Sequence, residues 1–424
     1  MQPETFQGSD YTYIAAHLVL QLAVILAAGK LGAELLERWT RLPGVLGELL
    51  AGAAIGPYAL GGIPIPVFGP LFGYTSSGGA FSVIPVSPEL WSVAQIGAIV
   101  LLFAVGLETE LHLFLRYTIP AIAVAIGGMA LPFILGDVIT VAFGLAEGFA
   151  SMEALFVGTI MTATSVGKTA RILSDLGRLD SPEGTTILVG AVIDDILGII
   201  VLAVIVELAG HERASAMETL AIVALALGFW SALMLSGILL SQRISRLLLA
   251  FRSAGASLAL VMAMAFLAAA LAKSFGLAMI IGAYTIGLAL SGGEISENLR
   301  EPIEGVVHVF APIFFVVVGM LVDFSAMAGV VLFGLSISGL AIVGKVVGYG
   351  LPALWVGFNP RGAARIGVGM MPRGEVAVII AGVGLGEGLV GSDVFGVSIL
   401  MTFITTLLAP ILLVPLFKGE PGTR

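Results

Sequence analysis

The stretch ILVGAVIDDILGIIVLAVIV, residues 187–206, decides the fold, because it places two adjacent acids, Asp194 and Asp195, inside a long apolar run. Such a run is long enough to cross a bilayer as a helix. One aspartate at the centre of a membrane helix costs about 2.5–3.5 kcal/mol on insertion scales, and adjacent acids also repel each other. We therefore expect the pair to bind something positive, a proton or a metal cation. The alternative is that one acid pairs with a basic residue for packing alone.

The composition of the whole chain indicates a membrane protein. Of 424 residues, 58% are hydrophobic and only 11% are charged, and the mean hydropathy is +1.09. The 56 glycines and 19 prolines fit a polytopic membrane protein, where they allow close helix packing and broken helices. The absence of cysteine excludes disulfides and thiolate-bound metals, and the four scattered histidines argue against a histidine metal centre. We expect no resident cofactor and, from the polar N-terminal stretch without Lys or Arg, no cleavable signal.

Apolar runs between charged or Gly/Pro-rich punctuation predict thirteen membrane-spanning helices. An all-α polytopic fold follows, because a chain that crosses lipid without closing a barrel must satisfy its backbone as helices. The expected spans lie at about 12–36, 43–60, 90–107, 117–143, 151–174, 184–208, 218–241, 254–274, 276–292, 302–321, 327–356, 362–386 and 393–416.

The basic residues predict the orientation of these spans. With the N-terminus outside and the C-terminus in the cytoplasm, most of the 19 Lys and Arg residues fall on the cytoplasmic side, Lys168 among them. Two fall in outer loops, and three, Lys30, Lys345 and Arg373, fall within spans. This bias follows the positive-inside rule.

Thirteen spans divide into six, one and six, which predicts two inverted-topology repeats joined by a linker helix. Corresponding spans of the two halves are poor continuous helices. The fifth contains GTIMTATSVGKT, residues 158–169, and the twelfth contains GVGMMPRGEV, residues 367–376. We predict that both are interrupted and cross each other, so that freed carbonyls and half-helix dipoles face an ion. For a single hydroxyl, small-residue helix packing is the alternative.

The remaining charges within spans each receive an interpretation. Lys345, near the middle of span 327–356, needs a partner, which the buried acids can supply. Lys30 lies in the cytoplasmic half of the first span, where a long side chain can snorkel. Arg373 and Glu375 are interpreted as an electrostatic brace for the second interrupted span. Three further residues are interpreted as structural, lining or interfacial groups: Glu108, Asp137 and His308.

Together these residues predict a chemistry. Asp195, the hydroxyls of Thr164 and Ser165, and freed carbonyls supply the oxygen ligands that Na⁺ prefers, and protonation of the carboxyl removes its affinity. Cation and proton then compete for one site, which with alternating access gives antiport. If Asp194 pairs with Lys345, an arriving cation breaks the pair and lets the lysine release a proton.

Several stretches resemble the monovalent cation:proton antiporter superfamily, in its Kef/NapA-like branch. They run through nearly the whole chain in the family's order: LPGVLGELLAGAAIGP (42–57), LLFAVGLET (101–109), TATSVGKTARILSDLGRLDSPEGT (162–185), IDDILG (193–198) and PRGEV (372–376). The resemblance implies a Na⁺/H⁺ antiporter in the prokaryotic cell membrane, not an enzyme. Its substrates are monovalent cations and protons, its surroundings are lipids, and it has no nucleic-acid partner.

The resemblance also implies an assembly and a mechanism. The homodimer scaffold comprises residues 1–116 and 254–322, the mobile core residues 117–210 and 323–424, and the linker helix residues 211–253, with elevator-like movement of the core. The second acid, Asp195, carries the ion and the proton, while Asp194 pairs with Lys345 as in electrogenic members. The potassium-efflux Kef proteins have glutamine in place of Asp194, and we expect no nucleotide-binding regulatory domain after residue 417.

Three other functions are alternatives. K⁺/H⁺ exchange uses the same chemistry, because oxygen ligands alone do not fix the cation. An intramembrane aspartyl protease also uses two buried acids, but adjacent Asp194 and Asp195 point about 100° apart on a helix and cannot share one water. A simple channel needs neither an inverted repeat nor a lysine opposite the acids. The cation preference, the stoichiometry and the pH range stay open at this stage.

Overall fold

The computed structural model describes residues 11–40, 44–65, 69–72, 84–149, 151–209, 216–251, 253, 255–291, 294–322, 331–386 and 390–418, and some side chains within these ranges, such as that of Glu375, are not described. The described part is almost entirely helical. It divides into two compact units, Met1–Gly97 with Val309–Asp323 and Ala98–His308 with Phe324–Arg424.

The first unit contains α1 (Tyr11–Thr40), α2 (Gly44–Ile55), the start of α3 (Pro88–Glu108) and the end of α11 (Glu294–Gly319). Between α2 and α3 lie a short 3₁₀ helix, η1 (Leu60–Gly62), and a small antiparallel hairpin of β1 (Pro64–Ile65) and β2 (Gly69–Pro70). The hairpin is a small departure from the expected all-α fold. Pro64 and Pro70 pair with each other at one end of this short ladder, and neither has an N–H with which to continue it.

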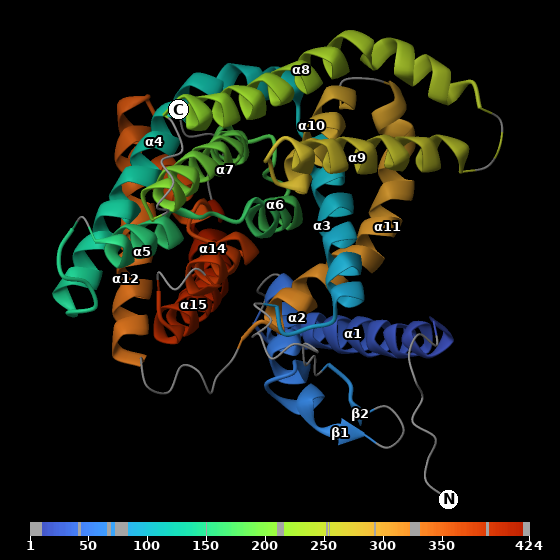
Figure 1. Cartoon of the computed structure of the whole chain (residues 1–424). Coiled ribbons are helices and arrows are strands. Elements are labelled where there is room, and N and C mark those ends of the chain that lie inside the picture. The colour runs from blue at the N-terminus through green and yellow to red at the C-terminus, as the bar shows by residue number, and fades with distance from the viewer. Residues whose placement is uncertain are drawn as a thin grey trace, which may run out of the picture. The chain divides into compact units, whose positions relative to one another are not determined.

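The second unit contains the other helices (Figure 1). These are α4 (Leu111–Ala142), α5 (Met152–Thr162), α6 (Val166–Asp175), α7 (Pro182–Ala209), α8 (Ala216–Leu249), α9 (Ala256–Ser274), α10 (Met279–Leu290), α12 (Val331–Trp355), α13 (Pro360–Gly369), α14 (Glu375–Gly386) and α15 (Ser392–Phe417). Each of the thirteen expected spans contains one or two of the described helices. Nine of the described helices are long and apolar enough to cross a membrane. The count of thirteen crossings and the inverted repeat stay predictions.

The two spans predicted to be interrupted are each broken into two helices. The first breaks between α5 and α6 at residues 163–165, and the second between α13 and α14 at residues 370–374. Pro372 explains the second break, because a proline lacks the N–H that continues a helix and disfavours helical backbone in the residue before it. Thr and Ser at the first break compete for backbone hydrogen bonds, and Thr162 Oγ1 donates to Thr159 O at 2.7 Å.

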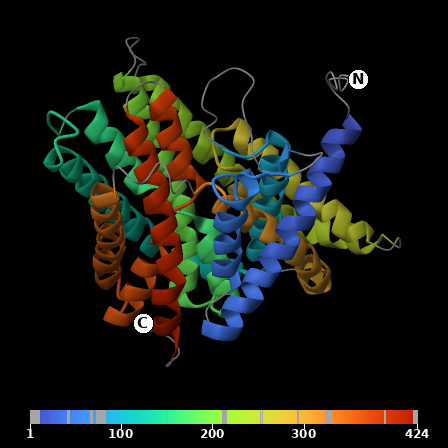
Figure 2. The same cartoon turned by 90° about the horizontal axis from the view of Figure 1, so that it is seen from below.

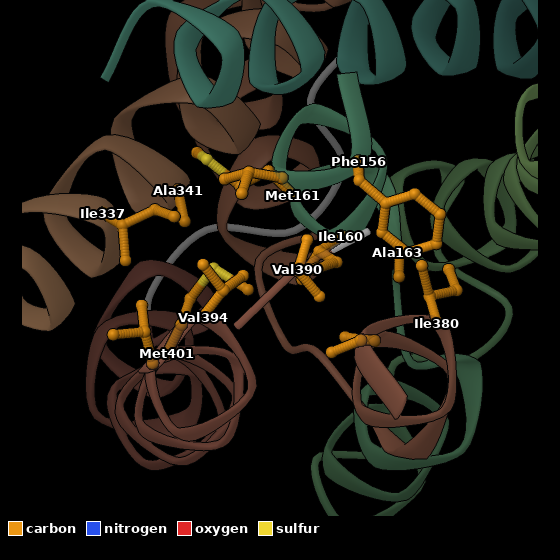
Figure 3. Packing of buried hydrophobic residues seen from close by; sticks show 14 of the residues in the cluster. Phe156, Ile160, Met161, Ala163, Ile337, Ala341, Ile380, Val390, Val394 and Met401 are labelled. Carbon is orange, nitrogen blue, oxygen red and sulfur yellow. The ribbon is translucent and has the colours of Figure 1, made fainter. Parts of the chain in front are cut away.

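A buried apolar cluster holds the broken helices of the second unit against their neighbours. It contains Phe156 and Ile160 of α5, Ile337 of α12, Ile380 of α14 and Met401 of α15, all at most 4% exposed (Figure 3). Packing of α15 against α12, α13 and α14 continues this core (Figure 2). The breaks therefore lie inside a packed interior, where an unpaired backbone group is costly.

Candidate functional site

The two breaks lie side by side, and we call residues 163–165 and 370–374 together the crossing. Its backbone is joined directly, since Ser165 N donates to Pro372 O at 2.8 Å and Thr169 Oγ1 donates to Gly369 O at 2.6 Å. The two breaks approach each other closely, since a methyl group added at Gly374 would lie 2.8 Å from Ser165 Oγ. The helices α5 and α13 end at the crossing, and α6 and α14 begin there. The negative ends of two helix dipoles and the positive ends of two others therefore meet at the crossing.

An ion pair between Asp194 and Lys345 lies against the crossing. The Lys345 ammonium lies 3.1 Å from Asp194 Oδ2, and both side chains are at most 1% exposed. The ammonium also donates to Thr162 O and to Thr164 Oγ1, each at 2.6 Å. Thr162 ends α5, so the lysine's positive charge meets the negative end of that half-helix. A buried charge of this kind is stable only when paired and hydrogen-bonded, as it is here.

The Asp194 carboxylate is not fully satisfied. Its Oδ2 accepts hydrogen bonds from Thr164 and Lys345, whereas its Oδ1 is buried and has no hydrogen-bond partner among the described residues. Buried polar atoms without a partner are rare in native structures. An acceptor of this kind is available to a cation.

Asp195 has a different environment from its neighbour. Asp194 is 3% exposed, whereas Asp195 is partly exposed. Successive residues of a helix point about 100° apart. Asp194 therefore faces Lys345, whereas Asp195 points in a different direction. Asp195 still acts electrostatically on Lys345.

Two further buried cations, Lys168 and Arg373, hold the crossing together. Arg373 Nη1 donates to Ala163 O at 2.8 Å, from the second break to the first. Lys168 Nζ donates to Arg373 O at 2.5 Å, from the first interrupted segment to the second, and to Thr406 Oγ1 of α15 at 3.2 Å. Lys168 is one of the basic residues expected on the cytoplasmic side, and that orientation stays a prediction. Its side chain is buried, 1% exposed, and lies at the crossing.

The backbone carbonyls that were predicted to bind the cation therefore already accept hydrogen bonds within the protein. Thr162 O, Ala163 O, Pro372 O and Arg373 O each accept a hydrogen bond from another part of the protein. The unwound backbone here serves first to join the two interrupted segments. Oxygen for a cation would come from the carboxylates, and from Thr162 and Thr164 when Lys345 moves away.

A cavity of about 210 Å³ lies between α3, α6 and α11 in the second unit, apart from the crossing. Its polar lining is Glu108, Arg171, Ser174, Asp175, Glu304 and His308. Ser174 Oγ lies 3.4 Å from Glu108 Oε2, and Arg171 Nε lies 3.0 Å from Asp175 Oδ1. Glu108 and His308 are thus lining residues, one of the roles that the sequence analysis considered for each.

Comparison with known proteins assigns the chain to a family. The family model described as "Sodium/hydrogen exchanger, transmembrane" matches residues 22–419. The chain belongs to the sodium/hydrogen exchanger family. It is 33% identical to the Na(+)/H(+)-K(+) antiporter GerN of Bacillus cereus, over 95% of this chain and 96% of that one. It is 37% identical to the high-affinity Na(+)/H(+) antiporter NhaS3 of Synechocystis, over 96% and 91%.

The fold is also that of a solved antiporter. The structure of the sodium proton antiporter MjNhaP1 from Methanocaldococcus jannaschii matches with a TM-score of 0.68, over 96% of this chain and all of that one, at 18% identity. The family model and the relatives confirm the predicted superfamily, while the Kef/NapA-like branch stays a prediction. The chain is a multi-pass membrane protein of this family, and its relatives are named antiporters, not proteases or channels.

The structure brings most of the predicted site residues of the chain together. Asp194, Lys345 and Thr164 are in direct contact, and Ser165 and Arg373 belong to the crossing. Thr164 had been grouped with Asp195, but its hydroxyl donates to Asp194. The side chain of Glu375 lies outside the described residues. Lys30, expected to snorkel, is half-exposed and pairs with Glu48 at 3.5 Å in the first unit.

Tyr349 belongs to the site but was not predicted from the sequence. Its hydroxyl lies 3.2 Å from Lys345 Nζ, and the ammonium also lies 4.8 Å from the centre of its ring. The spacing of four residues on one helix was the available signal, since residues i and i+4 share a helix face. Glu183 and Arg365, a buried ion pair at 2.9 Å between α7 and α13, had no comparable signal in the sequence.

Proposed function

We propose that the chain exchanges Na⁺ for protons across the membrane, with Asp195 as the shared cation and proton site and Asp194–Lys345 as a coupled ion pair. One observation carries this proposal: a fully buried ammonium is held by a carboxylate that keeps one oxygen without a described partner, directly beside a second, partly exposed acid. Nothing in packing alone requires two adjacent acids at this depth.

The proposed cycle follows from charge balance. A cation that reaches Asp195 is attracted by Asp194 as well, and its charge competes with that of Lys345 for the same carboxylate. Lys345 then loses its counter-charge in a buried site, where an unpaired ammonium is unfavourable, and releases its proton. In the opposite direction, protonation of Lys345 and Asp195 expels the cation. Exchange is electrogenic if both groups carry protons for each cation.

The larger movements are inferred from the family resemblance. In this proposal thirteen spans form two inverted repeats of six joined by α8. Residues 117–210 and 323–424 move like an elevator against a homodimer scaffold of residues 1–116 and 254–322. The protein lies in the plasma membrane with its N-terminus outside and its C-terminus in the cytoplasm. Thr164 and Ser165 assist the cation, while Arg373 and Glu375 support the crossing.

Exchange by the Asp195→Asn variant tests the proposal. Asparagine keeps the size of the side chain and removes both its charge and its proton, so we expect Na⁺-driven proton movement in vesicles to be lost while the protein still folds. Asp137→Asn is the matched control and should retain exchange, because no described hydrogen bond or ion pair joins this acid of α4 to the crossing. Exchange that survives in Asp195→Asn would rule out the carrier assignment.

K⁺/H⁺ exchange is the second candidate, and the name of the relative GerN, which includes both cations, favours keeping it. Carboxylate and hydroxyl oxygens do not by themselves choose between the two ions. Vesicles loaded at one pH and exposed in turn to Na⁺, Li⁺ and K⁺ separate the candidates. We expect Na⁺ to drive proton efflux at lower concentrations than K⁺, and the reverse order would make K⁺ the substrate.

A further inference from the structure

Thr164 is flanked by two peptide groups, and the second interrupted segment holds both of them. The carbonyl before Thr164, Ala163 O, accepts a hydrogen bond from Arg373 Nη1 at 2.8 Å. The amide after it, Ser165 N, donates to Pro372 O at 2.8 Å. The direction in which Thr164 points its hydroxyl therefore depends on where Pro372 and Arg373 lie.

Lys168 fixes the position of one of these two residues. Its ammonium donates to Arg373 O at 2.5 Å, and it belongs to α6, the half-helix that begins two residues after Thr164. These contacts close a ring. It runs from Thr164 along α6 to Lys168 and across to the Arg373 carbonyl, and the Arg373 guanidinium returns it to the residue before Thr164. A displacement of the Lys168 side chain is thus passed to Thr164 through two hydrogen bonds.

Hydrogen bonding alone does not explain a lysine at this position. Thr406 Oγ1 of α15 already donates to the same Arg373 carbonyl at 2.8 Å. A buried ammonium costs far more to remove from water than a buried hydroxyl, yet Lys168 is 1% exposed. The ammonium adds strength, because a charge-assisted hydrogen bond is about twice as strong as a neutral one. The second break is therefore held against α6 more firmly than a hydroxyl could hold it.

We propose that Lys168 is a positioning residue for cation binding, which holds Thr164 in place by fixing Arg373. This inference rests on the proposed function and adds to it a residue that acts on the cation site through another side chain. Lys168 does not have to touch the cation. It keeps the Thr164 oxygen, which bonds both to Asp194 and to Lys345, in the position from which that oxygen can turn to an arriving ion.

Na⁺-driven proton exchange in vesicles tests this assignment when the maximal rate and the Na⁺ concentration at half-maximal rate are measured separately. Lys168→Met keeps most of the length of the side chain and removes the ammonium. The Na⁺ concentration at half-maximal rate should rise about tenfold, the scale of one lost hydrogen bond to a charged group. Lys168→Arg keeps a charged donor and should restore most of the wild-type value. A purely structural role would lower the amount of folded protein, and with it the maximal rate, and leave that concentration unchanged.

Two comparisons separate positioning from a general disturbance of the core. Thr405→Val removes a buried hydroxyl of α15 whose described bonds are to carbonyls of its own helix, and should leave the Na⁺ concentration at half-maximal rate unchanged. In a Thr164→Val background, Lys168→Met should raise this concentration by less than about twofold, because Lys168 acts through Thr164. An unchanged value in the single variant Lys168→Met, or a full tenfold rise in the Thr164→Val background, overturns the inference.

If Lys168→Met does not accumulate in membranes, Lys168→Gln serves in its place. Its side chain is neutral and shorter, so it weakens the contact with Arg373 O while keeping a polar group in the buried site. The Na⁺ concentration at half-maximal rate should then rise about threefold. A wild-type value in this variant overturns the inference as well.

The two proposals fail differently. If the wild-type protein shows no Na⁺-driven proton exchange, or Asp195→Asn exchanges as fast as wild type, the proposed function fails and this inference fails with it. If both behave as expected and Lys168→Met keeps the wild-type Na⁺ concentration at half-maximal rate, only the role of Lys168 is lost.

Discussion

At the scale of single residues, Thr164 connects the two members of the ion pair. Its hydroxyl accepts from Lys345 at 2.6 Å and donates to Asp194, so one oxygen serves both charges. Thr164→Val keeps the shape and removes this oxygen. We expect the free energy of unfolding to fall by about 1–3 kcal/mol, the cost of leaving buried partners unsatisfied, and the apparent affinity for Na⁺ to fall as well. Thermal unfolding in detergent and the Na⁺ dependence of exchange measure the two effects.

Two matched variants separate a lost hydroxyl from a disturbed helix. Thr164→Ser keeps the oxygen and should retain most of both properties. Thr140→Val removes a buried hydroxyl whose one bond among the described residues is to the carbonyl of Gly136 in its own helix, so it should leave Na⁺ affinity unchanged. Equal loss of affinity in the Thr140 and Thr164 variants would contradict a specific role for Thr164.

Among the site residues, the charged ones within the membrane spans were the easiest to predict from the sequence. Asp194 and Lys345 are expensive to bury, so each had to have a partner, and the structure pairs them. The partner of Thr164 could not be predicted in the same way. A hydroxyl tolerates many neighbours, and which acid it meets depends on how α6 and α7 are rotated against each other.

At the scale of helices, the buried pair of Arg365 and Glu183 joins α13 to α7, and Arg365 also donates to Leu416 O of α15 at 3.0 Å. Glu183 Oε2 has no described partner, so the acid depends on this arginine. Arg365→Met leaves a buried carboxylate unpaired and should lower the free energy of unfolding by about 3–5 kcal/mol. Thermal unfolding of the purified protein measures the loss.

The neighbouring arginine provides the control for that prediction. Arg361 is exposed and donates to the same Leu416 carbonyl at 3.2 Å, so Arg361→Met should change stability by less than about 1 kcal/mol. Combining Glu183→Gln with Arg365→Met removes the unpaired charge and should recover much of the loss. A double variant as unstable as Arg365→Met alone would show that packing of the arginine, including its contact with the Phe417 ring, matters more than its charge.

The helix breaks could be predicted because their causes are local. Pro372 cannot continue α13, and a cluster of Thr and Ser weakens the helix between Thr162 and Val166. The position of Lys168 could not be predicted from its neighbours in the sequence. The sequence places Lys168 in the first interrupted span without indicating a partner, and only the approach of the second interrupted segment gives its ammonium the Arg373 carbonyl as an acceptor.

At the scale of the whole molecule, the helical membrane fold could be predicted from the apolar runs, and the family could be predicted from the order of the motifs. Both features are read directly along the chain. Which helices pack together did not follow. Packing of α4 against α12 depends on small residues such as Gly127 and Gly348, whose backbones approach closely, and glycine is too common in this chain for its pattern to identify a partner.

Competition between cation and proton should also appear in the stability of the whole protein. A ligand that binds only the folded state stabilises it by about 2.7 kcal/mol at one hundred times its dissociation constant. Na⁺ should therefore raise the unfolding temperature at alkaline pH and have little effect at acidic pH, where protons occupy the carboxylates. N-methylglucamine chloride at equal ionic strength controls for salt. The Asp195→Asn variant should lose this stabilisation while Asp137→Asn keeps it, because only a cation bound at the exchange site depends on Asp195. Equal stabilisation of wild type and Asp195→Asn by Na⁺ would place the cation elsewhere in the molecule.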